Sequence, residues 1–296
     1  MPTAQPKRRT ILITGASSGL GAALARELAP RADGLVLTAR RGSRLDEMTA
    51  EVRALGGEAL ALPDDLADPL APGRIVASTV ARFGGLDALI NNAGVGLPRY
   101  YAESDPEALR EQILVNFAAP VVLTRHALPY LIESRGAVIN VGSGVTAVAN
   151  SMLGVYGATK AGLAYWNDAL RRELRHRGVS VSLVDLGPVA TEFFEAVRRR
   201  ADDERRPLGI DPAPDGFYNA MRDRPPRCMT IPVDLAARRI VRLLDRPRRR
   251  LALPRRVVWP FRLAGGLLGL VPDLADVAIS GMIRRTEREE SRVPLR

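Results

Sequence analysis

The chain has 296 residues, 46% of them hydrophobic and 26% charged, so it is long enough to bury a large core and too apolar for a disordered polymer. A single cysteine, Cys228, excludes an intrachain disulfide, and two histidines are too few for a zinc cluster of the Cys/His type. The net charge of +10 is due to arginine, since Lys7 and Lys160 are the only lysines. With so few cysteines and histidines we expect no metal. The short arginine clusters at 198–200 and 248–250 lack interleaved aromatic residues, so we expect no nucleic-acid partner.

Apolar runs and helical patterns alternate along the chain. Strands are expected over 10–14, 34–40, 58–63, 86–94, 136–143 and 179–185. Helices are expected between them over 20–28, 43–55, 69–82, 106–134 and 154–177. Short apolar strands separated by helices require parallel pairing with helices on both faces, so the sequence predicts a doubly wound α/β sheet.

The last third of the chain interrupts this alternation. Residues 194–232 combine prolines with charges, and we interpret them as a substrate lid over the carboxyl edge of the sheet; a surface loop without ligand contact is the alternative. Residues 234–244 predict a helix capped by Asp234, followed by a last strand near 249–253. We expect one main domain over 9–255, which includes the lid, and a basic, amphipathic extension over 256–296.

A glycine-rich turn follows the first expected strand. The sequence TGASSGLG places Gly15, Gly19 and Gly21 between this strand and the next helix. Glycine at such positions allows a sharp turn, a close approach to a pyrophosphate and tight helix packing, while the helix amides face the phosphate. This spacing between a strand and a helix predicts a dinucleotide site.

The end of the second strand indicates which dinucleotide binds. A site selective for NAD(H) would present an acid to the ribose 2′-hydroxyl there, but this strand ends in Arg40 and Arg41. A guanidinium suits a 2′-phosphate, so we expect NADP(H), with Arg40 favoured over Arg41 as its ligand. Two surface arginines in an arginine-rich chain are the alternative.

Ser143, Tyr156 and Lys160 form the candidate catalytic group. Tyr156 and Lys160 are four residues apart and share one helix face, and Ser143 leaves the carboxyl end of the preceding strand. A cation beside a phenol favours the phenolate, by about 1.4 kcal/mol for each unit of pKa. We therefore expect Lys160 to make Tyr156 an effective acid and base, and Ser143 to hold the substrate oxygen.

Asn116 joins this group because of its backbone. Pro120 lies four residues later, has no N–H and crowds the carbonyl of Asn116. That carbonyl is then free to hold a water, which would connect Lys160 to solvent. A kinked core helix without any bound group is the alternative.

In this order, TGASSGLG, NNAG at 91–94, Asn116, Ser143, Tyr156-x-x-x-Lys160 and GPVAT at 187–191 resemble the short-chain dehydrogenase/reductase family, over about 9–195 and 233–253. The resemblance implies one Rossmann-type catalytic domain with a seven-stranded parallel sheet. It implies Tyr156 as proton donor and acceptor, Ser143 as carbonyl stabiliser, Lys160 on the nicotinamide ribose and Asn116 in a proton relay. The family usually has Pro-Gly where this chain has Gly187-Pro188, and the Ala-Arg-Arg sequence at 39–41 resembles NADP-preferring members.

Cofactor contacts are expected partly from these residue arguments and partly from the resemblance. The expected contact residues are Gly15, Ser17, Ser18, Gly19, Leu20, Gly21, Arg40, Arg41, Asp65, Leu66, Asn91, Asn92, Ala93, Gly94, Tyr156, Lys160, Pro188, Val189 and Thr191.

These expectations predict an NADP(H)-dependent oxidoreductase that moves a hydride between the nicotinamide and a carbonyl or secondary alcohol of a small, lipophilic substrate. A nucleotide-binding regulatory or scaffold protein without turnover is the first alternative. A nucleotide-sugar epimerase or dehydratase shares the Tyr/Lys pair but fits poorly with the glycine spacing and the lack of a large substrate domain.

The arginine-rich C-terminal part bears on location. No apolar stretch suited to a signal peptide precedes the first strand, so we expect a cytoplasmic protein. Residues 246–262 hold seven arginines and no acid beside Trp259 and Phe261, and the apolar run 263–272 is too short to span a membrane. We expect residues 246–283 to contact an anionic membrane surface, with packing on protein as the alternative. The resemblance implies a homodimer or homotetramer formed through the helices that carry Asn116 and Tyr156.

Overall fold

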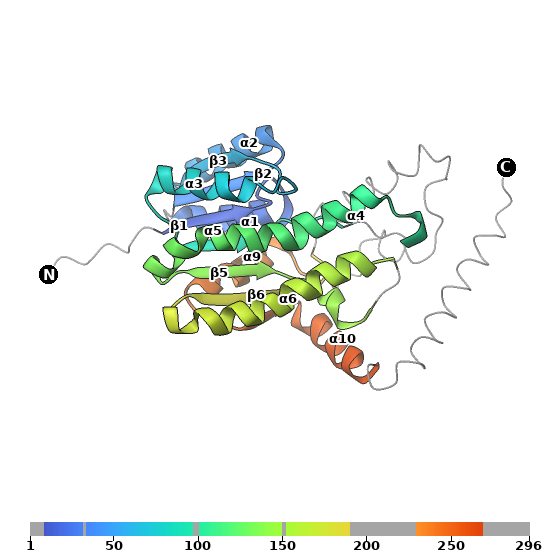
Figure 1. The fold of residues 1–296 in the computed structure, drawn as a ribbon. Helices are drawn as coiled ribbons and strands as arrows, with labels where there is room; N and C mark the ends of the chain where they lie inside the picture. Colours follow the sequence, from blue (N-terminus) through green and yellow to red (C-terminus); the bar gives the residue numbers. More distant parts are fainter. Residues whose placement is uncertain (1–8, 32–33, 97–100, 150–151, 190–228, 269–296) are drawn as a thin grey trace.

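The structure is a computed structural model that describes residues 9–31, 34–96, 101–149, 152–189 and 229–268 (Figure 1). Three of the sequence predictions concern residues that lie wholly or partly outside these ranges. The lid over 194–232 lies outside the described residues except for its last four positions, and Thr191 and the extension beyond residue 268 lie outside them entirely.

The core of the molecule is a seven-stranded sheet in the order β3-β2-β1-β4-β5-β6-β7, and all neighbouring strands are parallel. The strands are β1 (Thr10–Thr14), β2 (Gly34–Ala39), β3 (Glu58–Pro63), β4 (Ala88–Asn91), β5 (Ala137–Val141), β6 (Ser180–Leu186) and β7 (Arg250–Leu253). The predicted fold class is therefore confirmed. The strand order reverses between β1 and β4, which is where a doubly wound sheet opens a crevice at its carboxyl edge.

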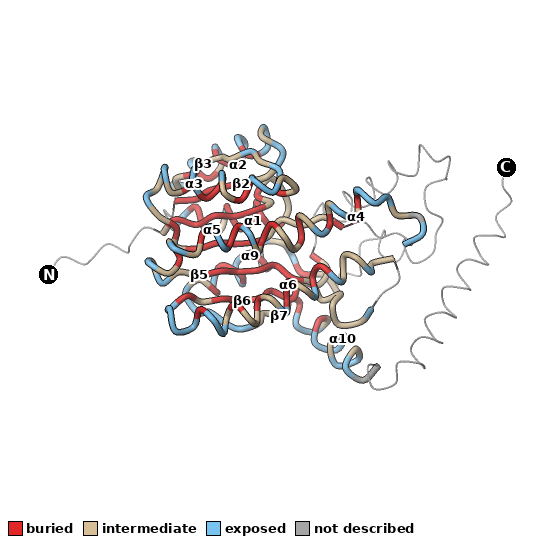
Figure 2. The backbone as a smooth tube through the Cα atoms, viewed as in Figure 1, coloured by how far each residue is buried: buried red, intermediate tan, exposed pale blue. Residues whose placement is uncertain are grey.

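Two layers of helices cover the sheet. One layer holds α1 (Gly19–Leu28), α2 (Gly42–Ala54) and α9 (Val233–Val241), and the other holds α3 (Ala71–Phe83), α5 (Ala119–Ser134) and α6 (Gly154–Leu174). Alternate residues of β1 point to opposite faces of the sheet: Ile11 and Ile13 pack in the cluster that includes α1, and Leu12 packs in the cluster that includes α3 and α5. Figure 2 shows the strands buried and the outer turns of the helices exposed.

The long helix expected over 106–134 is divided. It consists of α4 (Pro106–Ile113), a π-helical turn, η3 (Leu114–Ala118), and α5. The break directly precedes Pro120, which lies in the first turn of α5 and has no N–H to donate to the carbonyl of Asn116 four residues earlier. A single side-chain cap starts α4, since Asp105 accepts from the backbone N of Ala108 at 3.2 Å.

The predicted cap of the penultimate helix was wrong. The residue before α9 is Pro232, which has no capping side chain, and Asp234 lies within the first turn. A carboxylate there interacts favourably with the helix N-terminus without accepting its amide hydrogen bonds.

The chain continues from β7 into α10 (Arg255–Leu268), which packs against η4 (Gly144–Ala147), a short turn that follows β5. Figure 1 shows α4 and α10 beyond the carboxyl ends of the strands. Among the described residues, no helix combines the length and the apolar character needed to cross a membrane.

Candidate active site

The glycine-rich turn between β1 and α1 depends on the absence of side chains. Gly15 and Gly19 have φ of +67° and +54°, which L side chains rarely adopt. A Cβ on Gly21 would collide with the carbonyl oxygen of Gly15, and one on Gly15 would lie 2.9 Å from the Cα of Ala93. The turn therefore brings the start of α1 against the segment that follows β4.

Thr14 and Asn92 tie these two segments together. The hydroxyl of Thr14 accepts from the backbone N of Asn92 at 3.0 Å and of Ala93 at 2.9 Å. The Nδ2 of Asn92 donates to the carbonyl of Thr14 at 2.9 Å. Thr14 was not among the expected site residues, although a threonine at a strand end directly before a glycine was the available signal.

The two arginines after β2 go to different places. Arg41 donates to the hydroxyls of Ser18 at 2.7 Å and Ser17 at 3.1 Å, at the N-terminus of α1. Arg40 pairs instead with Glu111 of α4 at 2.9 Å, and its side chain is 58% exposed. The structure thus places Arg41 on the glycine-rich turn, although the sequence favoured Arg40.

Five other residues expected at the cofactor make structural contacts within the protein. Asp65 accepts from the backbone N of Ala67 at 3.0 Å, and Leu66 is buried in the core. The Nδ2 of Asn91 donates to the Oδ1 of Asn140 at 2.8 Å inside the protein, so this side chain is used in the buried layer beneath the sheet. After β6, the carbonyl of Pro188 accepts from Ile231 at 3.1 Å, and the neighbouring Val189 pairs with the same residue.

Ser143 and Tyr156 meet at the carboxyl end of β5. Ser143 directly precedes η4, and Tyr156 lies in the first turn of α6. Burial raises the pKa of the Tyr156 hydroxyl, and a hydrogen bond with the side chain of Ser143 lowers it in part. The hydroxyl of Ser143 also accepts from the backbone N of Val145 at 3.3 Å.

Lys160 is 4% exposed, one turn beyond Tyr156 on the same helix. Its Nζ donates to the carbonyl of Val141 at 3.0 Å, and burial lowers its pKa to about 8. The sequence-based expectation was that Lys160 would lower the pKa of Tyr156. Within the protein by itself burial outweighs any such effect, because both groups lose solvation at the end of β5.

Asn116 lies in the π-helical turn with its side chain fully buried. Its amide makes a two-way contact with Val95, donating to the carbonyl and accepting from the N, each at 2.8 Å. Gly94 lies beside it, where an added Cβ would be 3.3 Å from the Oδ1 of Asn116 and 3.4 Å from the Nζ of Lys160. The fold therefore brings Asn116, Gly94 and Lys160 together, and the water at the main-chain carbonyl of Asn116 stays a prediction.

This arrangement can be compared with known proteins. A family model described as short chain dehydrogenase matches residues 9–202. The chain belongs to the short-chain dehydrogenase/reductase family. The family prediction made from the motifs is thus confirmed.

Relatives in the family carry several activities in their names. The chain is 36% identical over 183 residues to ketoacyl reductase HetN of a Nostoc species, covering 62% of this chain and 64% of the relative. It is 33% identical over 213 residues to an 11-beta-hydroxysteroid dehydrogenase of Sesamum indicum, covering 70% and 61%. A fatty acyl-CoA reductase of Mycobacterium tuberculosis is 34% identical over 233 residues, covering 76% and 79%. The chain therefore spans less than two thirds of the first two relatives.

Solved structures of the family include complexes with the cofactor. A short-chain dehydrogenase from Sphingobium yanoikuyae in complex with NADPH has a TM-score of 0.70 and 30% identity, and the match covers 90% of this chain and 96% of that one. A metagenomic short-chain oxidoreductase in complex with NADP has a TM-score of 0.58 and 35% identity, covering 61% and 81%.

In this member of the short-chain dehydrogenase/reductase family, a buried chain of amides runs beneath α6. Asn91 donates to Asn140, and Asn140 donates in turn to Asn167 of α6 at 3.0 Å. Asn91 and Asn140 are paired neighbours on β4 and β5. Thr159 adds a contact nearer the site, since its hydroxyl bonds the carbonyl of Tyr156 at 2.8 Å and the Nδ2 of Asn116 at 3.3 Å. Sequence reasoning did not identify Thr159, Asn140 or Asn167, because their partners come from distant parts of the chain.

Proposed function

We propose that the protein is an NADP(H)-dependent oxidoreductase that interconverts a carbonyl and a secondary alcohol on a small-molecule substrate. The observation that carries the proposal is the hydrogen-bonded pair of hydroxyls from Ser143 and Tyr156, one helical turn from the buried Lys160. A phenol and a second hydroxyl at one point suit proton transfer to an oxygen that is held by a hydrogen bond.

The carboxyl edge fits a dinucleotide phosphate. Gly15, Gly19 and Gly21 allow the tight turn that brings a pyrophosphate to the start of α1, because two of them have positive φ and a Cβ on Gly15 or Gly21 would clash with neighbouring backbone. The first turn of α1 contains no acid that would repel the pyrophosphate. Arg41, held by Ser17 and Ser18, would meet a 2′-phosphate, and Arg40 lies next to it in the chain. The solved relatives in complex with NADP and NADPH support NADP(H) over NAD(H).

The cofactor supplies or accepts the hydride when it is bound. In reduction Tyr156 donates its proton to the substrate oxygen, which Ser143 holds with a hydrogen bond. The raised pKa keeps the Tyr156 hydroxyl protonated at neutral pH, so this group is ready to act as the donor. Lys160, with a pKa of about 8, holds a proton that can restore Tyr156.

A lipophilic substrate is the second part of the proposal. The relatives named for ketoacyl, hydroxysteroid and fatty acyl-CoA chemistry support an apolar substrate class. On α10, Trp259 and Leu263 are 48% and 63% exposed, and Arg255 and Arg256 at its start are exposed as well. Such a helix suits an anionic membrane surface, so we propose a cytoplasmic protein that contacts the inner face of the membrane.

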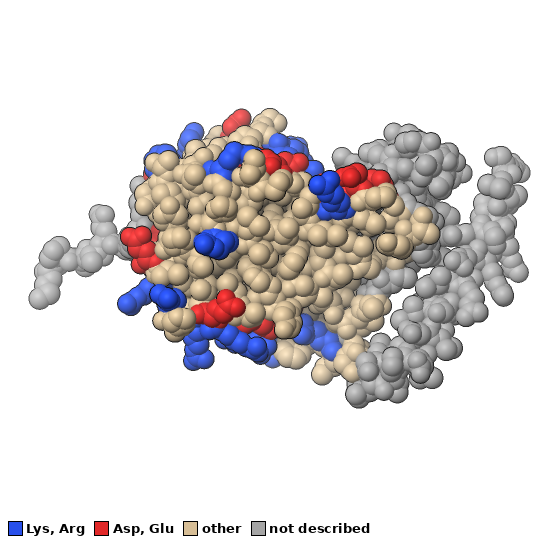
Figure 3. Space-filling model, in the orientation of Figure 1, with Lys and Arg blue, Asp and Glu red and all other residues tan. Residues whose placement is uncertain are grey.

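We also propose a homo-oligomer formed through α5 and α6. In Figure 3 the charged side chains gather at the upper and lower margins, and the face over these two helices is mostly uncharged. Tyr165 on α6 is 82% exposed and Val122 on α5 is 38% exposed. Uncharged surface with exposed large side chains is typical of subunit contacts. The count of subunits in solution, by light scattering, tests this point.

The proposed activity is tested with a series of ketones and aldehydes graded by chain length, with NADPH and NADH in parallel. Tyr156→Phe should lower kcat by about 10²–10⁴-fold, since it removes the proton donor. Tyr101→Phe, at an 80% exposed tyrosine of η2 (Tyr101–Glu103), is the matched control and should keep full activity. Turnover that persists in Tyr156→Phe contradicts the assignment, and tight NADPH binding without any turnover would favour a regulatory protein.

A further inference from the structure

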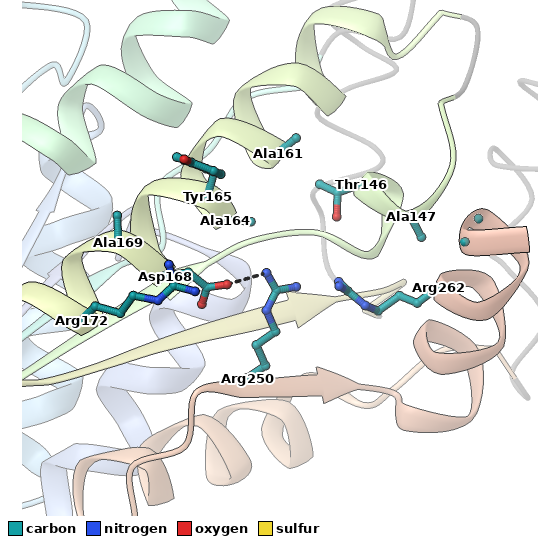
Figure 4. Close-up of a pocket in the computed structure, with 12 residues that line it drawn as sticks. Thr146, Ala147, Ala161, Ala164, Tyr165, Asp168, Ala169, Arg172, Arg250 and Arg262 are labelled. Atoms are coloured by element: carbon teal, nitrogen blue, oxygen red, sulfur yellow. Dashed lines mark hydrogen bonds and ion pairs between the residues drawn. The ribbon is translucent and has the colours of Figure 1, made fainter. Parts of the chain in front are cut away.

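A cavity of about 540 Å³ lies between α6, η4, β7 and α10 (Figure 4). Tyr165, Asp168 and Arg172 line it from α6. At 3.6 residues per turn, these positions lie about a third of a turn around the helix axis from Tyr156 and Lys160. The cavity is therefore separate from the catalytic face of α6.

Arginines dominate the charges around this cavity. Arg172, Arg250 and Arg262 line it from three different elements. In Figure 4, Arg250 from β7 and Arg262 from α10 point toward one another across the space. Two guanidinium groups that face each other repel unless an anion lies between them or close to both.

The acids nearby only partly balance this charge. Asp168 accepts from Arg249 at 2.9 Å and from Arg250 at 3.3 Å. Asp185, whose side chain is 2% exposed, pairs with Arg262 at 3.1 Å and with Arg250 at 3.6 Å. Two carboxylates thus pair with three arginines, Arg249, Arg250 and Arg262. Arg172 is a fourth arginine and has no hydrogen-bond or ion-pair partner among the described residues.

Donors remain unused inside the cluster. Arg262 makes its one described ion pair through NH1, so its other guanidinium donors are not used by that pair. A phosphoryl group in the cavity would accept from these donors and from those of Arg172 through charge-assisted hydrogen bonds. One oxygen of Asp185 is also buried without a hydrogen-bond partner among the described residues.

We propose that this cavity binds a phosphoryl group of a ligand other than the cofactor. Three guanidinium groups from three directions match the three or more acceptor oxygens of a phosphoryl group, whereas a carboxylate offers two. The ligand is either a soluble phosphate ester or a lipid headgroup, since both present the same anion.

Binding in this cavity bears on the substrate side of the enzyme through η4. Thr146 of η4 lines the cavity, and Ser143 directly precedes that turn. Gly265 of α10 lies against η4 so closely that an added Cβ would collide with the carbonyl of Ala147. A ligand that holds Arg262 therefore holds α10 against the turn that follows Ser143.

The test is calorimetric titration of inorganic phosphate into the protein saturated with NADP, so that the proposed cofactor's own phosphate positions are filled. The phosphoryl-site proposal depends on the proposed function only because the protein is first saturated with NADP. The heat of phosphate binding is measured whether or not the protein turns over a substrate, so the two proposals can fail separately. We expect one saturable phosphate site, weakened at least about fivefold by Arg172→Gln. Ala169→Glu, which adds an acid to the cavity wall, should abolish it.

Arg175→Gln is the matched control, because Arg175 is exposed and lies one turn beyond Arg172, outside the cavity. Thermal unfolding checks that all three variants are folded. Absence of saturable phosphate binding, or equal affinity in Arg172→Gln and Arg175→Gln, would overturn the proposal.

Competition then identifies the source of the phosphoryl group. Glycerol 3-phosphate and phosphatidylcholine vesicles with or without phosphatidic acid are added against bound phosphate. Displacement by glycerol 3-phosphate alone supports a soluble ester, and displacement by vesicles that contain phosphatidic acid supports a lipid headgroup. If neither competes, the site takes an adventitious ion only and the proposal is wrong.

Discussion

The glycine-rich turn and the start of α6 meet at the same edge of the sheet but are built by opposite means. The turn depends on missing side chains, because Gly15 and Gly21 allow backbone to approach backbone. The start of α6 depends on polar side chains that lose solvation, because desolvation moves the pKa values of Tyr156 and Lys160 in opposite directions. The first region should therefore fail when volume is added, and the second should respond to a change of charge.

The largest effect is expected from Gly21→Ala. The added methyl would collide with the carbonyl of Gly15, and neither backbone segment can move away cheaply. We expect NADPH binding to weaken by about 3 kcal/mol, more than a hundredfold in Kd, measured by fluorescence titration. Gly85→Ala is the control, because nothing lies within 4 Å of its added Cβ. Normal affinity in Gly21→Ala would show that the turn tolerates volume.

Lys160→Met tests the other region. The pKa of Lys160 is about 8 in the folded protein, against an ordinary value of 10.5, so the unfolded chain binds more protons between these values. The buried ammonium costs stability below pH 8, and this cost disappears as the pH rises to 10.5. We expect the variant to lose activity but to gain up to about 3 kcal/mol in free energy of unfolding at pH 7.

Urea unfolding of Lys160→Met and the unchanged protein at pH 7 and pH 10 measures this difference. The advantage of the variant should shrink at the higher pH. A variant that is less stable at pH 7 would mean that the bond from Lys160 to the carbonyl of Val141 outweighs the burial of charge.

A smaller effect is expected at the two arginines. Arg41 lies on the hydroxyls of Ser17 and Ser18, whereas Arg40 is paired with Glu111. Arg41→Ala should therefore raise the Kd for NADPH about tenfold, roughly 1.4 kcal/mol, and Arg40→Ala should raise it less, with the Kd for NADH unchanged in both. Arg44→Ala, at an exposed pair with Glu47, is the control. The reverse order of the two effects would restore the ranking that the sequence favoured.

The smallest effect is expected in the amide chain beneath α6. Asn167→Leu leaves the Nδ2 of Asn140 buried without its acceptor, so the free energy of unfolding should fall by about 1 kcal/mol. Glu173→Gln, at an exposed position of the same helix, should leave it unchanged. Urea unfolding measures both variants, and an unchanged midpoint in Asn167→Leu would show that this link is dispensable.

Much of the fold was predictable because its signals are local. The alternation of apolar runs and helical patterns predicted the parallel sheet, and the glycines of TGASSGLG predicted the turn, since backbone sterics depend on each residue itself. The division of the helix near Pro120 was predictable as a kink but not as a π-helical turn. The cap at Asp234 was wrong because the start of α9 is set by the chain that leads into it.

The sequence by itself therefore determined the family and the sheet, because spacing along a strand or helix decides which residues share a face. Only the tertiary structure decided that Arg41 lies on the glycine-rich turn while Arg40 pairs with Glu111 of α4. It also decided that Asn91 bonds Asn140 inside the protein. The same holds for Arg250 and Arg262, which face each other across a cavity. The reason is that a long polar side chain pairs with whatever the fold brings within its reach, and desolvation depends on every segment packed around it.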